Sequence, residues 1–343
     1  MDDLKKKNPL KTFLTILISL AIAAVFLWLA FRGLEIDKVL KSLENANYFW
    51  VFAAMLFGLG AYWFRAIRWN LLLEPMGYKI SNSNALWTLS FGYLMNLTIP
   101  RSGEVARATA LYGVEKVPVE KSFGTIILER IVDLICMILF LGLTLIFKFK
   151  AISSFYTFAT SQKSADAKTS SSLLYYILGG IFLLFFLLFF IFKSKLQAFS
   201  IYQKIANFGK GIVTGLKSIF HLKQKFKFIF LSLAIWVCYF FATYLVCFAL
   251  PETANFTIAD GFFIIVVGTL GMMVPASGGI GAFNFAMKIG FTALFLSMGL
   301  NPKTGAEIGL VYSFISLPLQ IFIMFVMGII SIPMLAKARK IKI

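Results

Sequence analysis

Eight charged residues lie within or beside strongly apolar segments of this 343-residue chain, and they are its best candidates for chemistry. Burying a charge in apolar surroundings is costly, so such a side chain pairs with an opposite charge or faces a cavity. The eight form three groups: Arg65 and Arg68; Arg101, Glu104 and Arg107; and Glu129, Arg130 and Asp133.

The middle group has the composition of an anion site. Intervals of three residues place Arg101, Glu104 and Arg107 along one face if the segment is helical, and Ser102 is a favoured N-cap residue. A helix that begins at Ser102 and Gly103 would offer free backbone N–H groups and a positive dipole end between two arginines, which suits a phosphate. Glu104 either holds the arginines in place or competes for them. The alternative is a salt-bridge cluster at the membrane interface.

Two carboxylates of the third group stand one helical turn apart. Glu129 and Asp133 would repel each other on one helix face unless a cation lies between them. Arg130 and the arginines of the middle group are the natural partners. A structural ion network, a proton relay and a carboxylate-assisted headgroup site all fit this pattern. Arg65 and Arg68 also share a face, and they either join the site or snorkel to the inner interface.

A short pattern near the middle group occurs a second time. Residues 91–104 read FGYLMNLTIPRSGE and residues 266–279 read VVGTLGMMVPASGG. The positions that match are Pro100 with Pro275, Ser102 with Ser277 and Gly103 with Gly278. Each copy ends an apolar run that is short for a full membrane span of about 20 residues. Paired interrupted segments of this kind point to a transporter's binding site, whereas two unrelated helix ends are the alternative.

The second copy has no charge and differs in chemistry from the first. Its candidate residues for a broken helix are Pro275, Ser277, Gly278, Gly279 and Gly281. Glycines permit unusual backbone angles and the close approach of another chain or a ligand.

Composition identifies the class of protein to which these segments belong. The chain is 59% hydrophobic and 14% charged, with a mean hydropathy of +0.85, which indicates a polytopic membrane protein. The net charge of +18 comes from Lys and Arg placed mostly between apolar runs. There they orient the chain and attract anionic lipid, so we expect no nucleic-acid partner.

The sequence predicts no metal site, cofactor or nucleotide motif. The single histidine, His221, lies in a basic stretch without an apparent ligand partner. Cys136, Cys238 and Cys247 all fall in apolar segments, so they are expected to be reduced thiols rather than disulfides or metal ligands.

The expected fold is an all-α polytopic membrane protein with six full transmembrane helices and two short broken or re-entrant segments in two inverted halves. The full spans are expected near 12–31, 49–68, 122–147, 173–192, 228–250 and 306–335, and the short segments at 85–99 and 258–274. Residues 1–343 should form one integral-membrane domain, with halves at about 12–147 and 173–335.

Lysine-rich stretches set the expected orientation. They lie at the N-terminus, at 193–227 and in the C-terminal tail, which predicts that both termini are cytoplasmic. The segment 85–99 then enters from the cytoplasm and 258–274 from outside. Three full crossings separate the two, and an odd number inverts the second copy relative to the first.

Four stretches together resemble a known membrane family, the lysylphosphatidylglycerol synthase transmembrane, or flippase-like, family. They are RAIRW at 65–69, NLTIPRSGEVAR at 96–107, LERIVD at 128–133 and PASGGIGAFN at 275–284, and the resemblance covers about 10–335. It implies movement of aminoacylated phospholipid between leaflets. The chain ends at Ile343, where an aminoacyl-transferase domain would follow, so we expect a stand-alone member without synthase activity. Asn284 and Phe314 stand where family members often have Glu and Arg. The resemblance therefore implies lipid transport less strongly for the second half than for the first.

The resulting expectation is a protein that binds or translocates a phospholipid, which we expect to be anionic, or a lipid-linked headgroup. Arg101 and Arg107 would contact the phosphate, while Glu129 and Asp133 would hold a cation or the positive part of a headgroup. The alternative is a membrane-embedded lipid-modifying enzyme or an accessory subunit of lipid synthesis. We expect the plasma membrane of a prokaryote as the location. A second copy or a lipid-synthesis protein is the expected protein partner.

Overall fold

The computed structural model describes residues 36–99, 101–161, 217–274 and 276–341, together with scattered positions between 17 and 29 and between 210 and 214. All elements in this part of the chain are helices, so the all-α prediction is confirmed. The predicted span at 173–192, most of that at 12–31, and both Pro100 and Pro275 lie outside the described residues.

Four long helices dominate the described part of the chain, and each is long and apolar enough to cross a membrane. They are α3 (Tyr48–Leu73), α6 (Val119–Ser161), α9 (Lys225–Cys247) and α12 (Pro302–Ile341). These helices confirm four of the six predicted spans and make the chain a multi-pass membrane protein. The orientation of the termini stays a prediction.

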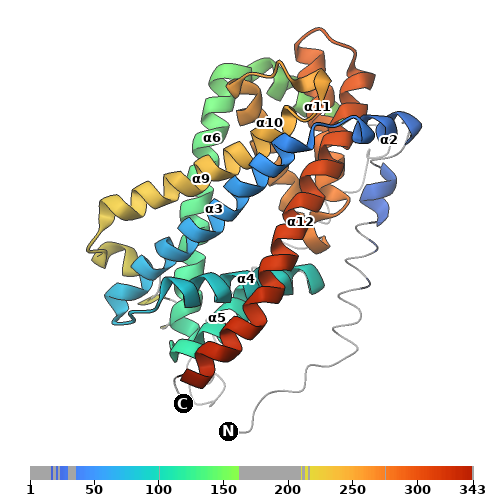
Figure 1. Cartoon of the computed structure of the whole chain (residues 1–343). Coiled ribbons are helices and arrows are strands. Elements are labelled where there is room, and N and C mark those ends of the chain that lie inside the picture. The colour runs from blue at the N-terminus through green and yellow to red at the C-terminus, as the bar shows by residue number, and fades with distance from the viewer. Residues whose placement is uncertain are drawn as a thin grey trace, which may run out of the picture.

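Two pairs of short helices lie between the long ones. The first pair is α4 (Asn82–Thr98) and α5 (Gly103–Glu115), and the second is α10 (Ile258–Met272) and α11 (Ala282–Ser297). The order long, short, short, long therefore occurs twice. Figure 1 shows α4 and α5 toward one end of the bundle and α10 and α11 toward the other, which is the arrangement that two inverted halves require.

The remaining elements are short and join the main helices. They are α2 (Ile36–Glu44) and the single-turn helices η1 (Glu74–Met76), η2 (Ser218–His221), η3 (Pro251–Thr253) and η4 (Ser277–Gly279).

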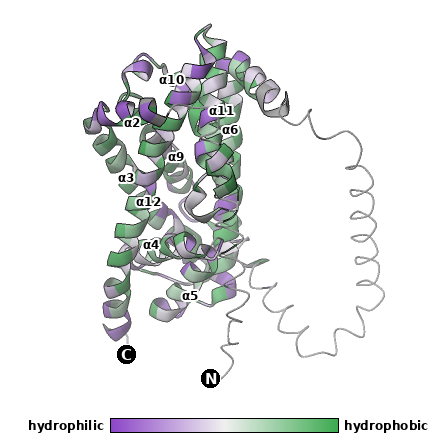
Figure 2. Ribbon diagram, turned by 90° about the vertical axis from the view of Figure 1, so that its right-hand side faces the viewer, coloured by the Kyte–Doolittle hydropathy of each residue, from purple (hydrophilic) through white to green (hydrophobic). Residues whose placement is uncertain are grey.

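The packing follows from which side of each helix is apolar. The largest buried cluster is formed mainly by side chains of the four helices α9, α10, α11 and α12. It includes the fully buried rings of Phe263, Phe291 and Tyr312. By contrast, α6 leaves Ile131, Ile135 and other large apolar side chains exposed on its outer face. Figure 2 shows hydrophobic colouring along the long helices and hydrophilic residues toward the two ends. Such an outer surface is suited to lipid tails.

Glycines set the close contact between α4 and α5. A Cβ atom on Gly92 would lie 2.8 Å from the carbonyl oxygen of Gly103, and one on Gly103 would overlap the Gly92 carbonyl and the Asn96 side chain. The two backbones therefore touch at a point where only glycine fits. This contact fixes the start of α5 against α4, where the charged groups meet.

Candidate functional site: a buried arginine cluster

Seven charged side chains from α3, α5 and α6 meet in one place, and we call them the arginine cluster. They are Arg65, Arg68, Glu104, Arg107, Glu129, Arg130 and Asp133. The structure thus brings together all three groups of charged residues found in the sequence, with the exception of Arg101.

Arg65 and Arg68 point into the protein and bind Asp133. Arg65 donates to one carboxylate oxygen of Asp133, and Arg68 donates to the other at 2.9 Å. Both arginines are buried, with exposed fractions of 4% and 0%, so neither snorkels to the membrane surface. Arg65 also donates to the Tyr93 hydroxyl at 2.6 Å, and Arg68 to the Ser232 hydroxyl at 3.3 Å.

Glu129 is held by two other guanidinium groups. Arg107 donates to Glu129 Oε2 at 2.6 Å, and Arg68 lies 3.6 Å from Glu129 Oε1. The guanidinium of Arg107 also lies over the Trp69 ring, 3.6 Å from its centroid, while the Trp69 indole donates to Thr125. A cation over an indole face is attracted by the ring, so Trp69 positions Arg107.

The carboxylates of the arginine cluster do not accept hydrogen bonds from all of its guanidinium nitrogens. Four arginines face three carboxylates, which leaves one positive charge. Arg107 Nε and Nη2 are buried without a hydrogen-bond partner in the described part of the chain. Buried polar groups are normally paired, and an unpaired charged one is expensive. Arg107 therefore keeps two donors available for an anion.

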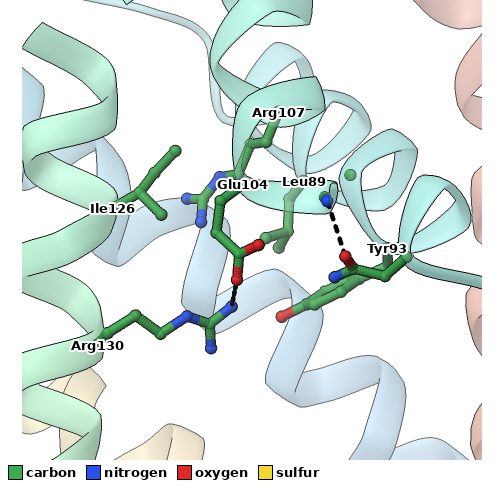
Figure 3. A pocket seen from close by; sticks show the side chains of 9 residues that line it. Leu89, Tyr93, Glu104, Arg107, Ile126 and Arg130 are labelled. Carbon is green, nitrogen blue, oxygen red and sulfur yellow. Dashed lines mark hydrogen bonds and ion pairs between the residues drawn. The ribbon is translucent and has the colours of Figure 1, made fainter. Parts of the chain in front are cut away.

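A small hollow is lined in part by Arg107. Nine residues from α4, α5 and α6 line it: Leu89, Gly92, Tyr93, Asn96, Gly103, Glu104, Arg107, Ile126 and Arg130 (Figure 3). Its volume of about 10 Å³, counted as space for the centre of a water molecule, admits about one water. In this conformation the hollow is too small for a phosphate group.

The start of α5 differs in one detail from the sequence prediction. Ser102 does occupy the N-cap position, but its hydroxyl donates to the carbonyl oxygens of Met95 and Ile99 instead of accepting from the helix. Asn96 accepts from the Gly103 N–H at 2.7 Å and thus satisfies one free donor of the helix start. Asn96 and Tyr93 are not evident as site residues from the sequence, because neither is charged and both precede the loop.

Arg101 lies apart from the cluster and joins the two repeats. Its backbone is left-handed, with φ of 62°, and its exposed side chain donates to the Met273 carbonyl oxygen at 2.6 Å. Met273 follows α10, so the loops of the two hairpins meet here. A phosphate contact by Arg101 stays a prediction that this conformation does not display.

The second repeat contributes backbone geometry rather than charge. Gly278, Gly279 and Gly281 have φ values of 60°, 76° and 82°, which confirms that these glycines adopt unusual backbone angles. Within the described residues there is no group of three His, Cys, Asp or Glu side chains that could hold a metal ion.

Comparison with known proteins supports a membrane family. The family model for the lysylphosphatidylglycerol synthase TM region matches residues 16–324. Glycosyltransferase AglD of Haloferax volcanii is 22% identical over 305 residues, covering 82% of this chain and 49% of its own length.

Two further relatives are UPF0104 membrane proteins. That of Methanocaldococcus jannaschii is 28% identical over 122 residues, 35% of this chain and 36% of its own length. That of Pyrococcus horikoshii is 23% identical over 142 residues, 40% of this chain and 41% of its own length. The matched parts thus span about a third to a half of these relatives. No solved structure is significantly similar to the chain.

Proposed function

The chain belongs to the lysylphosphatidylglycerol synthase TM-region family, and from that premise we propose that it binds the phosphate of a lipid headgroup at the arginine cluster and moves that lipid between leaflets. The broader assignment, a membrane protein of lipid or glycan-carrier metabolism, is supported by the family and by the relative named as a glycosyltransferase. The finer assignment depends on the chemistry of the cluster.

The free donors of Arg107 carry this proposal. Arg107 is buried, lines the hollow, and has two guanidinium nitrogens without a partner in a cluster with one surplus positive charge. A phosphate supplies several acceptor oxygens and a negative charge, and the planar guanidinium fork matches it well. A headgroup phosphate would therefore satisfy both the hydrogen bonds and the charge.

The position of the hairpins supports movement rather than static binding. The hairpin α4–α5 comes from one end of the bundle and α10–α11 from the other (Figure 1). Their loops meet at the hydrogen bond between Arg101 and Met273. Short helices that meet from opposite sides are typical of transporters that expose one site alternately to each side. The hollow must widen for a headgroup to enter.

A second candidate function is an accessory role in lipid glycosylation. The observation in its favour is the match of 82% of this chain to a relative named as a glycosyltransferase. Glu129 and Asp133 each form ion pairs with at least two arginines. Neither carboxylate is therefore free to act as a general base in this conformation. That arrangement favours binding of a lipid-linked phosphate over catalysis by the carboxylates.

Replacing Arg107 by Lys tests the proposed function. Lysine can still pair with Glu129 but lacks the second branch of the guanidinium fork, so we expect about tenfold slower transbilayer movement with the protein still folded. The assay uses vesicles with fluorescent phosphatidylglycerol, read by quenching in the outer leaflet, beside a thermal-unfolding measurement. Arg339→Lys in the last turn of α12 is the control. Parent-like lipid movement by Arg107→Lys would contradict the assignment.

The double variant Arg107→Gln/Glu129→Gln keeps the test informative if the lysine variant misfolds. It removes both charges of the pair at once, so no unpaired charge stays at this contact. We expect a folded protein that no longer moves the lipid. A folded double variant with full transport would also refute the proposal.

A further inference from the structure

Glu104 is the carboxylate of the arginine cluster that no buried arginine holds. Its described ion-pair partner is Arg130, at 3.1 Å between Glu104 Oε1 and Arg130 Nη2. The two side chains are 27% and 47% exposed, whereas the other pairs between α5, α3 and α6 are buried. An exposed pair of this kind contributes little to stability, at most about 1 kcal/mol. Stability alone is therefore a weak reason for a carboxylate at this place.

Glu104 lines the hollow together with Arg107. Figure 3 shows the Glu104 side chain extending from α5 toward Arg130, across the hollow that Arg107 also lines. Glu104 precedes Arg107 by three residues on α5, so both side chains lie on the same side of that helix. The Glu104 carboxylate thus adds negative charge to the lining of the hollow, where among the described residues it pairs with Arg130 and not with Arg107.

Arg130 has a second carboxylate within reach. Its Nη1 lies 3.8 Å from Asp133 Oδ2, one turn along α6. If Glu104 moves away, Arg130 remains near a negative charge and keeps its other nitrogens for a ligand. Once Glu104 has moved, the guanidinium groups of Arg107 and Arg130 both line the hollow without a competing carboxylate.

We propose that Glu104 is an internal competitor that occupies the place of the headgroup phosphate, leaves when the lipid binds, and returns to help release it. The inference rests on the proposed function and adds the regulation of the same site. The size of the hollow supports it, because space for about one water cannot admit a phosphate until Glu104 has moved. A competitor tethered to the same helix is present at high effective concentration and lowers the apparent affinity of the ligand.

The competition also sets the chemical class of the ligand. A phosphate has more acceptor oxygens than a carboxylate and can bridge Arg107 and Arg130 at once, so it displaces Glu104. A lipid whose only anion is a carboxylate, such as a fatty acid, has no such advantage over Glu104. The site therefore selects phosphate-bearing lipids over carboxylate-bearing ones.

The variant Glu104→Gln tests the competition, because glutamine keeps the shape and removes the charge. We expect phosphatidylglycerol in nanodiscs of neutral phosphatidylcholine to bind about three- to tenfold more tightly, while its movement across vesicle membranes becomes slower. Tighter binding with slower turnover is a combination that loss of a merely structural ion pair does not produce. Glu120→Gln, in the first turn of α6 and outside the hollow, is the control and should change neither quantity.

Further arms separate the possible outcomes. Glu104→Asp keeps the charge with a shorter reach and should give an intermediate gain in affinity, which serves if the glutamine variant misfolds. Palmitate should bind poorly to the parent and gain most from Glu104→Gln. An equal gain for soluble glycerol 3-phosphate would support the competition and assign the site to the phosphate group without its acyl chains.

Failure of this inference is distinguishable from failure of the proposed function. If the parent binds and moves phosphatidylglycerol but folded Glu104→Gln binds it no more tightly, the competitor role is refuted and the function stands. If neither the parent nor the variant binds phosphatidylglycerol or glycerol 3-phosphate, the proposed function fails and the inference fails with it.

Discussion

The two halves of the molecule arrange their helices in the same order but join them through different chemistry. In the first half α5 meets α6 through the ion pair of Arg107 and Glu129, at 2.6 Å. In the second half α11 meets α12 through Asn284, which donates to the Ser313 hydroxyl at 2.8 Å. Asn284 also accepts from the Gly281 N–H, so its hydrogen bonds are directed at the helix start and the neighbouring helix.

The same contrast separates the contacts between the long helices. Charged groups join α3 to α6, since Arg68 donates to Asp133 at 2.9 Å. A neutral bond joins α9 to α12, since the Tyr312 hydroxyl donates to the Thr243 carbonyl oxygen at 2.8 Å. The neutral hydrogen bond pairs its donor with its acceptor. In the charged centre, guanidinium nitrogens of Arg107 have no partner, which is why we assign the headgroup phosphate to the first half.

The two positions at which the resemblance implies a different residue, Asn284 and Phe314, lie near the neutral contact of the second half. Asn284 contacts Ser313, the residue before Phe314 in α12, so both departures lie where α11 meets α12. A Glu and an Arg at these positions would put charge there as well.

The largest expected effect is on the charged centre. Glu129→Gln removes the partner of Arg107 and one of the partners of Arg68, both buried. Unpairing a buried charge costs about 3–5 kcal/mol, so we expect a large loss of thermal stability and low expression. Asn284→Ala in the neutral centre should cost about 1–3 kcal/mol, because it leaves only neutral groups unpaired. Equal losses, measured by thermal unfolding in detergent, would remove the distinction between the halves.

A glycine substitution tests how tightly the first hairpin holds the cluster. In Gly103→Ala the new Cβ would overlap Asn96 and the Gly92 carbonyl, so we expect a loss of about 1–3 kcal/mol and weaker lipid binding as α5 moves from α4. Gly113→Ala in the same helix is the matched control, since a Cβ there meets nothing within 4 Å. It should be neutral or stabilising by up to about 1 kcal/mol. A neutral result for Gly103→Ala would show that the contact is looser than described.

The ring beneath Arg107 offers a smaller change at the same site. Trp69→Phe keeps an aromatic face under the guanidinium but removes the bond to Thr125, so we expect a loss of about 1 kcal/mol. Phosphatidylglycerol affinity should fall by about two- to fivefold because Arg107 is less firmly positioned. Trp87→Phe, whose indole bonds to Ser83 outside the hollow, should leave lipid affinity unchanged.

The smallest effect should be at the bond between the halves. Arg101→Ala removes one exposed hydrogen bond to Met273, which is worth about 0.5–1.5 kcal/mol. Because Arg101 lies outside the cluster, the affinity for phosphatidylglycerol should change less than in Arg107→Lys. If Arg101→Ala lowers the affinity for phosphatidylglycerol as much as Arg107→Lys does, Arg101 contacts the phosphate, as the sequence predicts.

Much of the fold could be predicted because membrane insertion depends on local sequence. The apolar lengths predicted α3, α6, α9 and α12, and the short apolar runs near 85–99 and 258–274 correspond to α4 and α10. The cost of a charge in lipid singled out Arg65, Arg68, Arg107, Glu129 and Asp133, which all join the cluster. These inferences need only neighbouring residues.

The tertiary structure alone decided which charges meet and which donors stay free. Arg65 and Asp133 are 68 residues apart, and their pairing depends on how α3 and α6 are rotated and placed against each other. The packing of the helices also pairs Glu129 with Arg107 and lets Asn96 cap α5. It places the Arg101 side chain against the Met273 carbonyl oxygen. Sequence spacing fixes the face of a helix on which a side chain lies, but partners on other helices are chosen by packing. The surplus charge beside Arg107 follows from that choice.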